Sequence, residues 1–75
     1  MAVTPEEAAK YIVRIVHERS DPGTWGMLHW LTGPFNIDPY EPEDAQPGLA
    51  FALDSGWIEV EKDRIRVTAK GQSAA

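Results

Sequence analysis

Residues 58–67 read IEVEKDRIRV, so apolar side chains alternate with charged ones on both sides of Lys62 and Asp63. A period of two is typical of a strand with one face buried, and a polar pair between two such runs indicates a hairpin. With a two-residue turn at Lys62 and Asp63, acidic side chains of the first strand lie opposite basic ones of the second. The predicted pairs are Glu61 with Arg64 and Glu59 with Arg66, and the predicted inward residues are Ile58, Val60, Ile65 and Val67.

The hairpin needs a core to cover it, and the chain has material for only one. It has 75 residues, of which 43% are apolar, and it has no cysteine, so hydrophobic packing must supply the stability. We therefore expect a single domain over residues 1–75. Glu6 and Glu7 precede the first apolar run, which is the reverse of a signal peptide, and no apolar run reaches the roughly 20 residues of a membrane span. A cytoplasmic protein is expected.

A first helix is predicted from the capping box Thr4-Pro5-Glu6-Glu7 to about Arg19. Its apolar residues spread over roughly 200° of arc, which is wide for a helix packed on one side only. Either this helix lies centrally between two other elements, or its spare flank meets a second copy in a homodimer.

The middle of the chain predicts a short helix over residues 24–33, capped by Thr24 or Asp21 and closed by Gly33. Residues 34–46 contain three prolines and four acids, which favours an extended loop. We expect Phe35, Ile37 and Tyr40 to order that loop.

A third helix is predicted from about Asp44 or Gln46 to Ser55, closed by Gly56. Phe51 points away from its apolar stripe, either as an exposed anchor or covered by the loop 34–46. The predicted buried stripe is Ala45, Leu49, Ala52 and Leu53.

The stretch from Leu49 to Gly71, about a third of the chain, resembles the winged helix-turn-helix superfamily of bacterial regulators. The shared features are an apolar-rich helix, the sequence Gly56-Trp57-Ile58, a short hairpin and the ending Thr68-Ala69-Lys70-Gly71. The resemblance implies an α+β winged-helix domain, with three helices followed by a two-stranded antiparallel β-hairpin wing. It also implies DNA binding, with the third helix in the major groove and the wing on the backbone.

Charge argues against that function. No Lys or Arg occurs between Ser20 and Glu61; residues 1–61 carry three basic and eleven acidic residues, net −8, and residues 62–75 four basic and one acidic, net +3, which gives the total of −5. Such a surface repels phosphate. A DNA-binding regulator that acts as a dimer through its wing is therefore the alternative hypothesis. Its phosphate contacts would be Lys62, Arg64, Arg66 and Lys70.

The leading hypothesis is a non-catalytic adaptor or inhibitor that binds a protein partner through an acidic, aromatic face. One version of it is a mimic of nucleic acid. Aromatic residues beside a charged rim are typical of interface anchors. We expect Trp57 in the core and leave open whether Trp25 and Trp30 are core or interface residues. The predicted partner-binding residues are Trp25, His29, Trp30, Asp38, Tyr40, Glu41, Glu43, Asp44, Phe51 and Asp54.

Catalytic and metal motifs are missing from the sequence. His17 and His29 lie on different predicted helices, no serine stands in a G-x-S-x-G setting, and the acidic loop lacks calcium-site spacing. We expect no enzyme activity, no metal and no cofactor.

Overall fold

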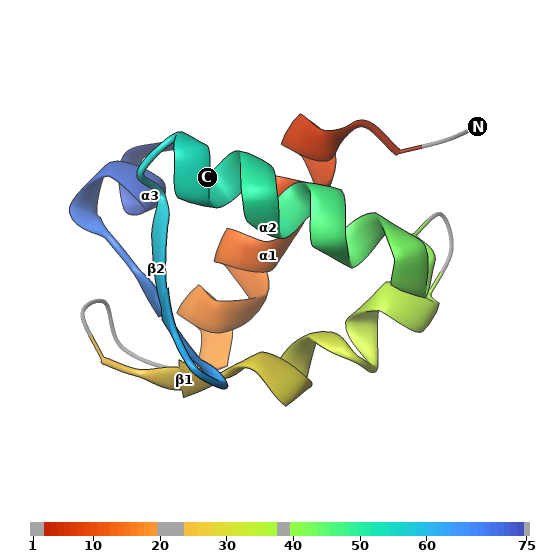
Figure 1. The fold of residues 1–75 in the computed structure, drawn as a ribbon, viewed down its shortest axis with the longest axis horizontal. Helices are drawn as coiled ribbons and strands as arrows, with labels where there is room; N and C mark the ends of the chain where they lie inside the picture. The colour runs from red at the N-terminus through yellow and green to blue at the C-terminus, as the bar shows by residue number, and fades with distance from the viewer. Residues whose placement is uncertain (1–2, 20–23, 38–39, 75) are drawn as a thin grey trace.

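The computed structural model describes residues 3–19, 24–37 and 40–74, and within these ranges the chain has an α+β fold (Figure 1). Helix α2 crosses in front of helix α1, the hairpin of strands β2 and β3 closes one side, and short 3-10 helices run along the edge opposite α2. The elements are α1 (Pro5–Arg19), β1 (Gly26–Met27), η1 (Leu28–Leu31), η2 (Pro34–Asn36), η3 (Pro42–Asp44), α2 (Ala45–Asp54), β2 (Ile58–Glu61), β3 (Arg64–Val67) and α3 (Ala69–Ala74).

Helix α1 is the centre of the core. It packs against α2, η1, β3 and α3, so its wide apolar arc is used within one chain. Thr4 caps it by accepting the Glu7 N–H at 3.1 Å, as the capping box predicts. Helix α1 therefore lies between other elements of the chain, as the first interpretation expects. The buried residues of α1 are Ala8, Ala9, Ile12, Val13, Ile15 and Val16.

Helices α1 and α2 approach each other closely at Gly48. A Cβ atom built on Gly48 would lie 2.7 Å from the Cβ of Ala8, closer than two carbon atoms tolerate. Gly48 and Ala8 therefore set the distance between the two helices. The observed bounds of α2 lie within one or two residues of the predicted ones.

The hairpin has the predicted register, with Glu61 opposite Arg64 and Glu59 opposite Arg66. Lys62 adopts a left-handed conformation with φ of 58° in the turn. Three of the four inward residues are buried, but Val60 is 36% exposed. Val60 lies on the outer strand β2, with a neighbouring strand on one side only, whereas its partner Ile65 lies between β1 and β2.

Of the predicted helix over residues 24–33, only the 3-10 helix η1 over Leu28–Leu31 is found. Gly26 and Met27 pair with Ile65 and Arg64, which makes a three-stranded antiparallel sheet of order β1-β3-β2, and a 3-10 turn follows. The strand supplies partners for the backbone of β3, and these tertiary hydrogen bonds outweigh local helix propensity.

The predicted extended loop over 34–46 instead contains η2 and η3, each of which begins at a proline, whose fixed φ suits a first helical position. Phe35 is buried and Tyr40 is half-buried, as expected for residues that order the segment. The same expectation is wrong for Ile37, which is 61% exposed, and Leu53, placed in the buried stripe of α2, is 46% exposed.

Helix α3 was not expected, and it explains the T-x-x-G ending. The Thr68 hydroxyl accepts the Gly71 N–H at 3.1 Å and donates to the Gly56 carbonyl. A Cβ atom at Gly71 would lie 2.1 Å from the Trp57 carbonyl oxygen, so only glycine permits this approach. The motif therefore fastens α3 to the turn between α2 and β2.

Candidate functional site

The residues predicted to bind a partner do not form one surface, and Trp25 lies with the hairpin. Its ring centroid is 4.5 Å from the guanidinium carbon of Arg66 and 5.4 Å from that of Arg64. These distances are those of cation–π contacts. Trp25 therefore braces the wing, by which we mean the hairpin 58–67, and is half-buried there.

The two arginines of the wing also have acidic partners. Arg66 donates its Nε–H to Glu59 at 2.9 Å, and Arg64 lies 3.2 Å from the Glu61 carboxylate. Lys62 and Lys70 are exposed and form no ion pair with any residue in the described ranges. Of the four predicted phosphate contacts, the two arginines are thus already engaged within the chain.

Trp30 lies over β1. A Cβ atom at Gly26 would meet the Trp30 ring at 2.5 Å, so the ring occupies the space that a side chain would need. On its other flank the guanidinium of Arg19 is 6.0 Å from the ring centroid. His29, its neighbour in η1, is exposed. Trp30 is therefore half-buried and contributes to the fold.

Tyr40 anchors the acidic segment to α1. Its ring stacks on Tyr11 with centroids 3.8 Å apart and planes 6° from parallel, and both rings meet Phe35 edge-on. The Tyr11 hydroxyl donates to the Pro34 carbonyl at 3.1 Å. This aromatic cluster holds η2 and the start of η3 against the core. The predicted partner residue Asp38 lies outside the described residues.

The acidic residues have different roles. Glu43 is exposed, whereas Asp44 is half-buried and accepts the Glu41 N–H at 2.9 Å, and Glu41 caps η3 in return. Asp54 is also exposed but lies at the far end of α2, roughly 15 Å along the helix from Asp44 at 1.5 Å per residue. The carboxylates therefore do not form a single cluster.

Phe51 is half-buried. Its ring contacts Trp57 edge-on, with centroids 5.5 Å apart. Trp57 lies three residues beyond the end of α2.

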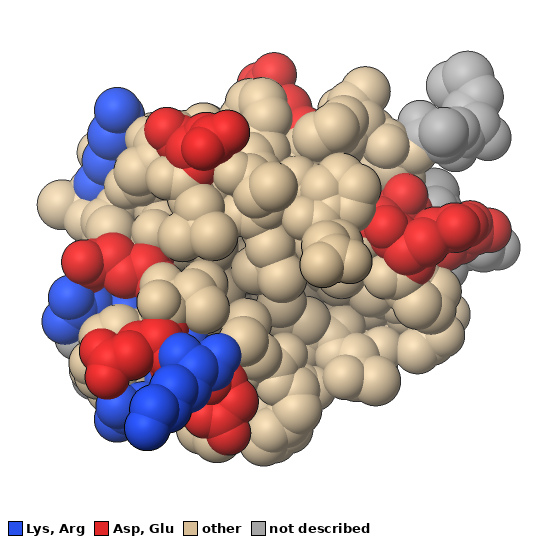
Figure 2. Space-filling view, viewed as in Figure 1, with Lys and Arg blue, Asp and Glu red and all other residues tan. Residues whose placement is uncertain are grey.

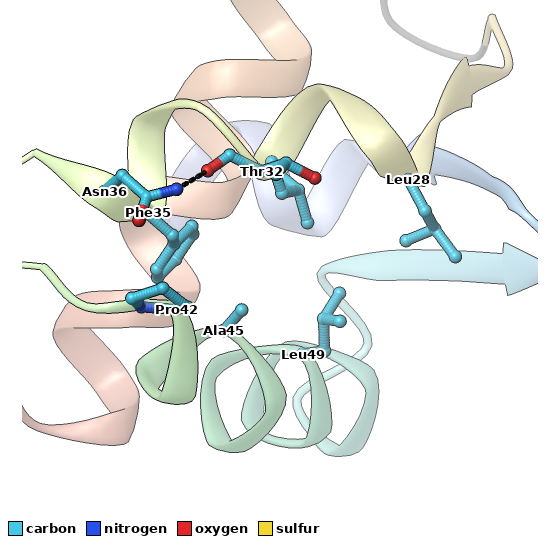
Figure 3. Close-up of a pocket in the computed structure, with 8 residues that line it drawn as sticks. Leu28, Thr32, Phe35, Asn36, Pro42, Ala45 and Leu49 are labelled. Carbon is cyan, nitrogen blue, oxygen red and sulfur yellow. Dashed lines mark hydrogen bonds between the residues drawn. The ribbon is translucent and has the colours of Figure 1, made fainter.

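Sequence reasoning missed an apolar groove between the 3-10 segment and α2 (Figure 3). Leu28, Phe35 and Leu49 project into it from three different elements. The groove encloses about 350 Å³, near the lower end of the roughly 300–1,000 Å³ that ligand pockets span. Its lining is Leu28, Leu31, Thr32, Phe35, Asn36, Pro42, Ala45 and Leu49.

The hydrogen bond between the polar groups of the groove lies at its outer wall and not at its floor. The Asn36 side-chain amide donates to the Thr32 carbonyl at 2.7 Å, across the outer wall of the groove. Within the described residues no buried side-chain nitrogen or oxygen lacks a hydrogen-bond partner. The groove therefore presents mainly carbon to a ligand.

Charge surrounds the groove asymmetrically. Pro42 lines it, and its chain neighbours Glu41 and Glu43 are exposed. Figure 2 shows an uncharged band across the centre of this face, with a purely acidic patch at one end and the mixed charges of the wing at the other. None of the lining residues is charged, and the full chain carries a net charge of −5.

A hint of the groove was available in the sequence. Leu28 and Leu31 share one side of their segment, and Leu49 belongs to the predicted stripe of α2. Their apolar faces meet only in part, because the short 3-10 turns stand off from α2, and periodicity cannot show that distance.

Other kinds of site find little support in the described ranges. No group of three or more His, Cys, Asp or Glu residues there is arranged to hold a metal ion. No helix there is both long enough and apolar enough to cross a bilayer.

Comparisons with protein-family models, with curated proteins and with solved structures found no match to this chain.

Proposed function

We propose that this chain is a small non-catalytic adaptor or inhibitor that binds a protein partner through the apolar groove. The observation that carries the proposal is an open pocket of about 350 Å³ with an apolar lining, beside the exposed residue Glu43. An apolar centre within a charged rim is the usual anatomy of a protein interface.

A winged-helix-like scaffold is part of the proposal. Its support is the order of elements, with α1, the 3-10 segment and α2 followed by the wing. Strand β1 and helix α3 are additions to the three helices and two-stranded wing that the sequence resemblance implies. In such a scaffold the outer side of α2 would face DNA, and its exposed residues are Gln46, Pro47, Ala50, Leu53 and Asp54.

Those residues suit a protein partner better than DNA. Contacts with phosphate and base edges come mostly from Arg, Lys, Asn, Gln, Ser and Thr, and only Gln46 among them qualifies. The DNA-regulator alternative draws its support from Lys62 and Lys70, because Arg64 and Arg66 are held by Glu61, Glu59 and Trp25. We favour the protein partner for that reason.

Nucleic-acid mimicry is the weaker form of the proposal. A mimic needs a row of carboxylates in place of phosphates, whereas Asp44 serves as a cap and Asp54 lies at the other end of α2. The apolar groove has no counterpart in a phosphate backbone. An adaptor or inhibitor with an apolar anchor site fits these features better.

The test is affinity capture with a groove-blocking variant. Thr32 is exposed at the groove wall, so Thr32→Arg places a bulky cation at the entrance without disturbing buried residues. Thr24→Arg is the matched control, because Thr24 is exposed outside the lining. Immobilised protein is exposed in parallel to untreated and nuclease-treated lysates of cells that express it, and captured proteins are identified by mass spectrometry.

We expect one protein or complex to be captured by wild type and Thr24→Arg and lost with Thr32→Arg. Equal capture by all three forms would move the partner site away from the groove. Capture that disappears on nuclease treatment would favour the DNA-binding alternative.

A further inference from the structure

We propose that the groove takes a basic amphipathic helix of the partner, whose bulky apolar side chains enter the pocket while its Lys or Arg residues meet Glu43. This inference rests on the proposed function and specifies the chemistry of the partner. It is carried by the apolar lining, the helical walls and the sign of the surrounding charge.

The apolar part of the partner follows from the lining. Leu28, Phe35 and Leu49 face the pocket from η1, η2 and α2. Several backbone N–H groups of the lining are already bonded: that of Leu28 to the Asp63 carbonyl, that of Thr32 to His29 and that of Asn36 to Gly33. A ligand therefore gains mainly by removing carbon surface from water. Side chains such as Leu, Phe or Met supply that surface, so the partner must present at least one of them.

The helical form of the partner follows from the walls of the groove. An extended peptide binds best where a sheet edge offers unpaired N–H and C=O groups, which it can pair as an added strand. Both walls here are helical, and the edge strands β1 and β2 contribute no lining residue. A segment that satisfies its own backbone, which is a helix, is therefore preferred.

The basic character of the partner follows from charge complementarity. Glu43 is exposed next to the lining residue Pro42, and its carboxylate forms no ion pair with a described residue. A cationic helix is attracted to this end of the groove, whereas an anionic one is repelled. The exposed side chain of Ile37, which follows the lining residue Asn36, offers further apolar contact.

The inference is tested with four synthetic helical peptides of about 18 residues, or five turns. Three share a leucine stripe at the spacing i, i+3, i+4, i+7 and carry Lys, Gln or Glu at the remaining positions. The fourth keeps the lysines and replaces the leucines by serine. Each peptide is labelled and titrated with the full chain by fluorescence anisotropy, once at low salt and once at about 150 mM salt. At the higher salt concentration the Debye length is roughly 8 Å, so charges farther apart than this are largely screened.

We expect the Lys/Leu peptide to bind most tightly, the Gln/Leu peptide less so and the Glu/Leu peptide least, with about a tenfold span in Kd between first and last. The Lys/Ser peptide should not bind. Equal affinity for the Gln/Leu and Lys/Leu peptides would contradict the proposal that the partner helix is basic. Binding of Lys/Ser as tight as Lys/Leu would overturn the apolar anchor.

Variants of the protein separate the groove from the overall negative charge. Glu43→Lys should raise the Kd of the Lys/Leu peptide severalfold and leave the Kd of the Gln/Leu peptide unchanged. Glu18→Lys, the same change at an exposed position on α1 outside the lining, should alter neither. Equal losses with Glu43→Lys and Glu18→Lys would show that only net charge matters and would overturn the proposal.

The result with Thr32→Arg distinguishes this inference from the function on which it rests. If no peptide binds while Thr32→Arg still abolishes capture from the lysate, the groove binds a partner of other chemistry and the inference is wrong. If capture survives Thr32→Arg, the proposed function fails. A wild-type dimer in sedimentation equilibrium that Thr32→Arg converts to monomer would assign the groove to a second copy of this chain.

Discussion

The guanidinium carbon of Arg66 lies 4.5 Å from the centroid of the Trp25 ring, which joins the wing to the residue before β1. The same guanidinium is bonded to Glu59. Arg66 therefore has an internal task, although its position in the sequence suggests a phosphate contact. Several expectations depend on this distinction between side chains that stabilise the fold and side chains that remain available.

Replacing Arg66 by alanine should destabilise the domain by about 1 kcal/mol, the sum of an exposed cation–π contact and a surface ion pair. Arg14→Ala, at an exposed position on α1, should change the free energy of unfolding by less than about 0.5 kcal/mol. Urea unfolding followed by tryptophan fluorescence measures both. Equal effects of the two variants would show that the stacking on Trp25 contributes nothing.

Binding to duplex DNA should be weak. At about 150 mM salt we expect a Kd no tighter than the usual non-specific range of roughly 10⁻⁴ to 10⁻⁶ M. Of the four predicted phosphate contacts, Arg64 and Arg66 are engaged within the chain, and the net charge is −5. Anisotropy titrations with labelled duplexes provide the measurement. Sub-micromolar, sequence-selective binding would establish the regulator alternative in place of the adaptor.

Gly48→Ala should destabilise the domain by roughly 1–3 kcal/mol, because the added methyl group would overlap Ala8 and force the helices apart. This loss exceeds the gain of about 1 kcal/mol from better helix propensity. Gly33→Ala is the control: its φ of −65° is helical and a Cβ there meets nothing within 4 Å, so the variant should be neutral or slightly more stable. Thermal melts compare them, and an unchanged Tm for Gly48→Ala would contradict the close crossing.

Asp44 and Glu43 should behave differently although they are adjacent. Asp44→Ala should cost about 1 kcal/mol, because Asp44 accepts the Glu41 N–H in the turn that leads into α2. Glu43→Ala should change the stability by less than about 0.5 kcal/mol. Chemical denaturation tests the pair, and equal costs would mean that the capping contact is not the source of stability in η3.

Sequence patterns predicted the parts of the fold that local periodicity determines. The alternation in 58–67 gave the register of the hairpin, and capping and glycine signals gave the bounds of α1 and α2 to within one or two residues. Strand β1, within the predicted helix 24–33, could not be found this way. The pairing of Gly26 with Ile65 is a contact between distant parts of the chain, and no local pattern reveals it.

The candidate site was harder to predict than the fold. Aromatic residues were expected to mark the interface, but Trp25, Tyr40 and Phe51 each contact another side chain of the same chain. The groove arises where aliphatic faces are held apart by two proline-initiated turns. Its depth depends on that spacing, which is a property of the folded chain.

Amide chemical-shift mapping of the labelled chain with its captured partner tests the central proposal most directly. The largest changes should fall on the groove walls, residues 28–36 and 42–49, and the wing at 58–67 should change little. Changes concentrated on the wing, with the groove walls unaffected, would contradict the proposal and place the partner on Lys62, Arg64 and their neighbours.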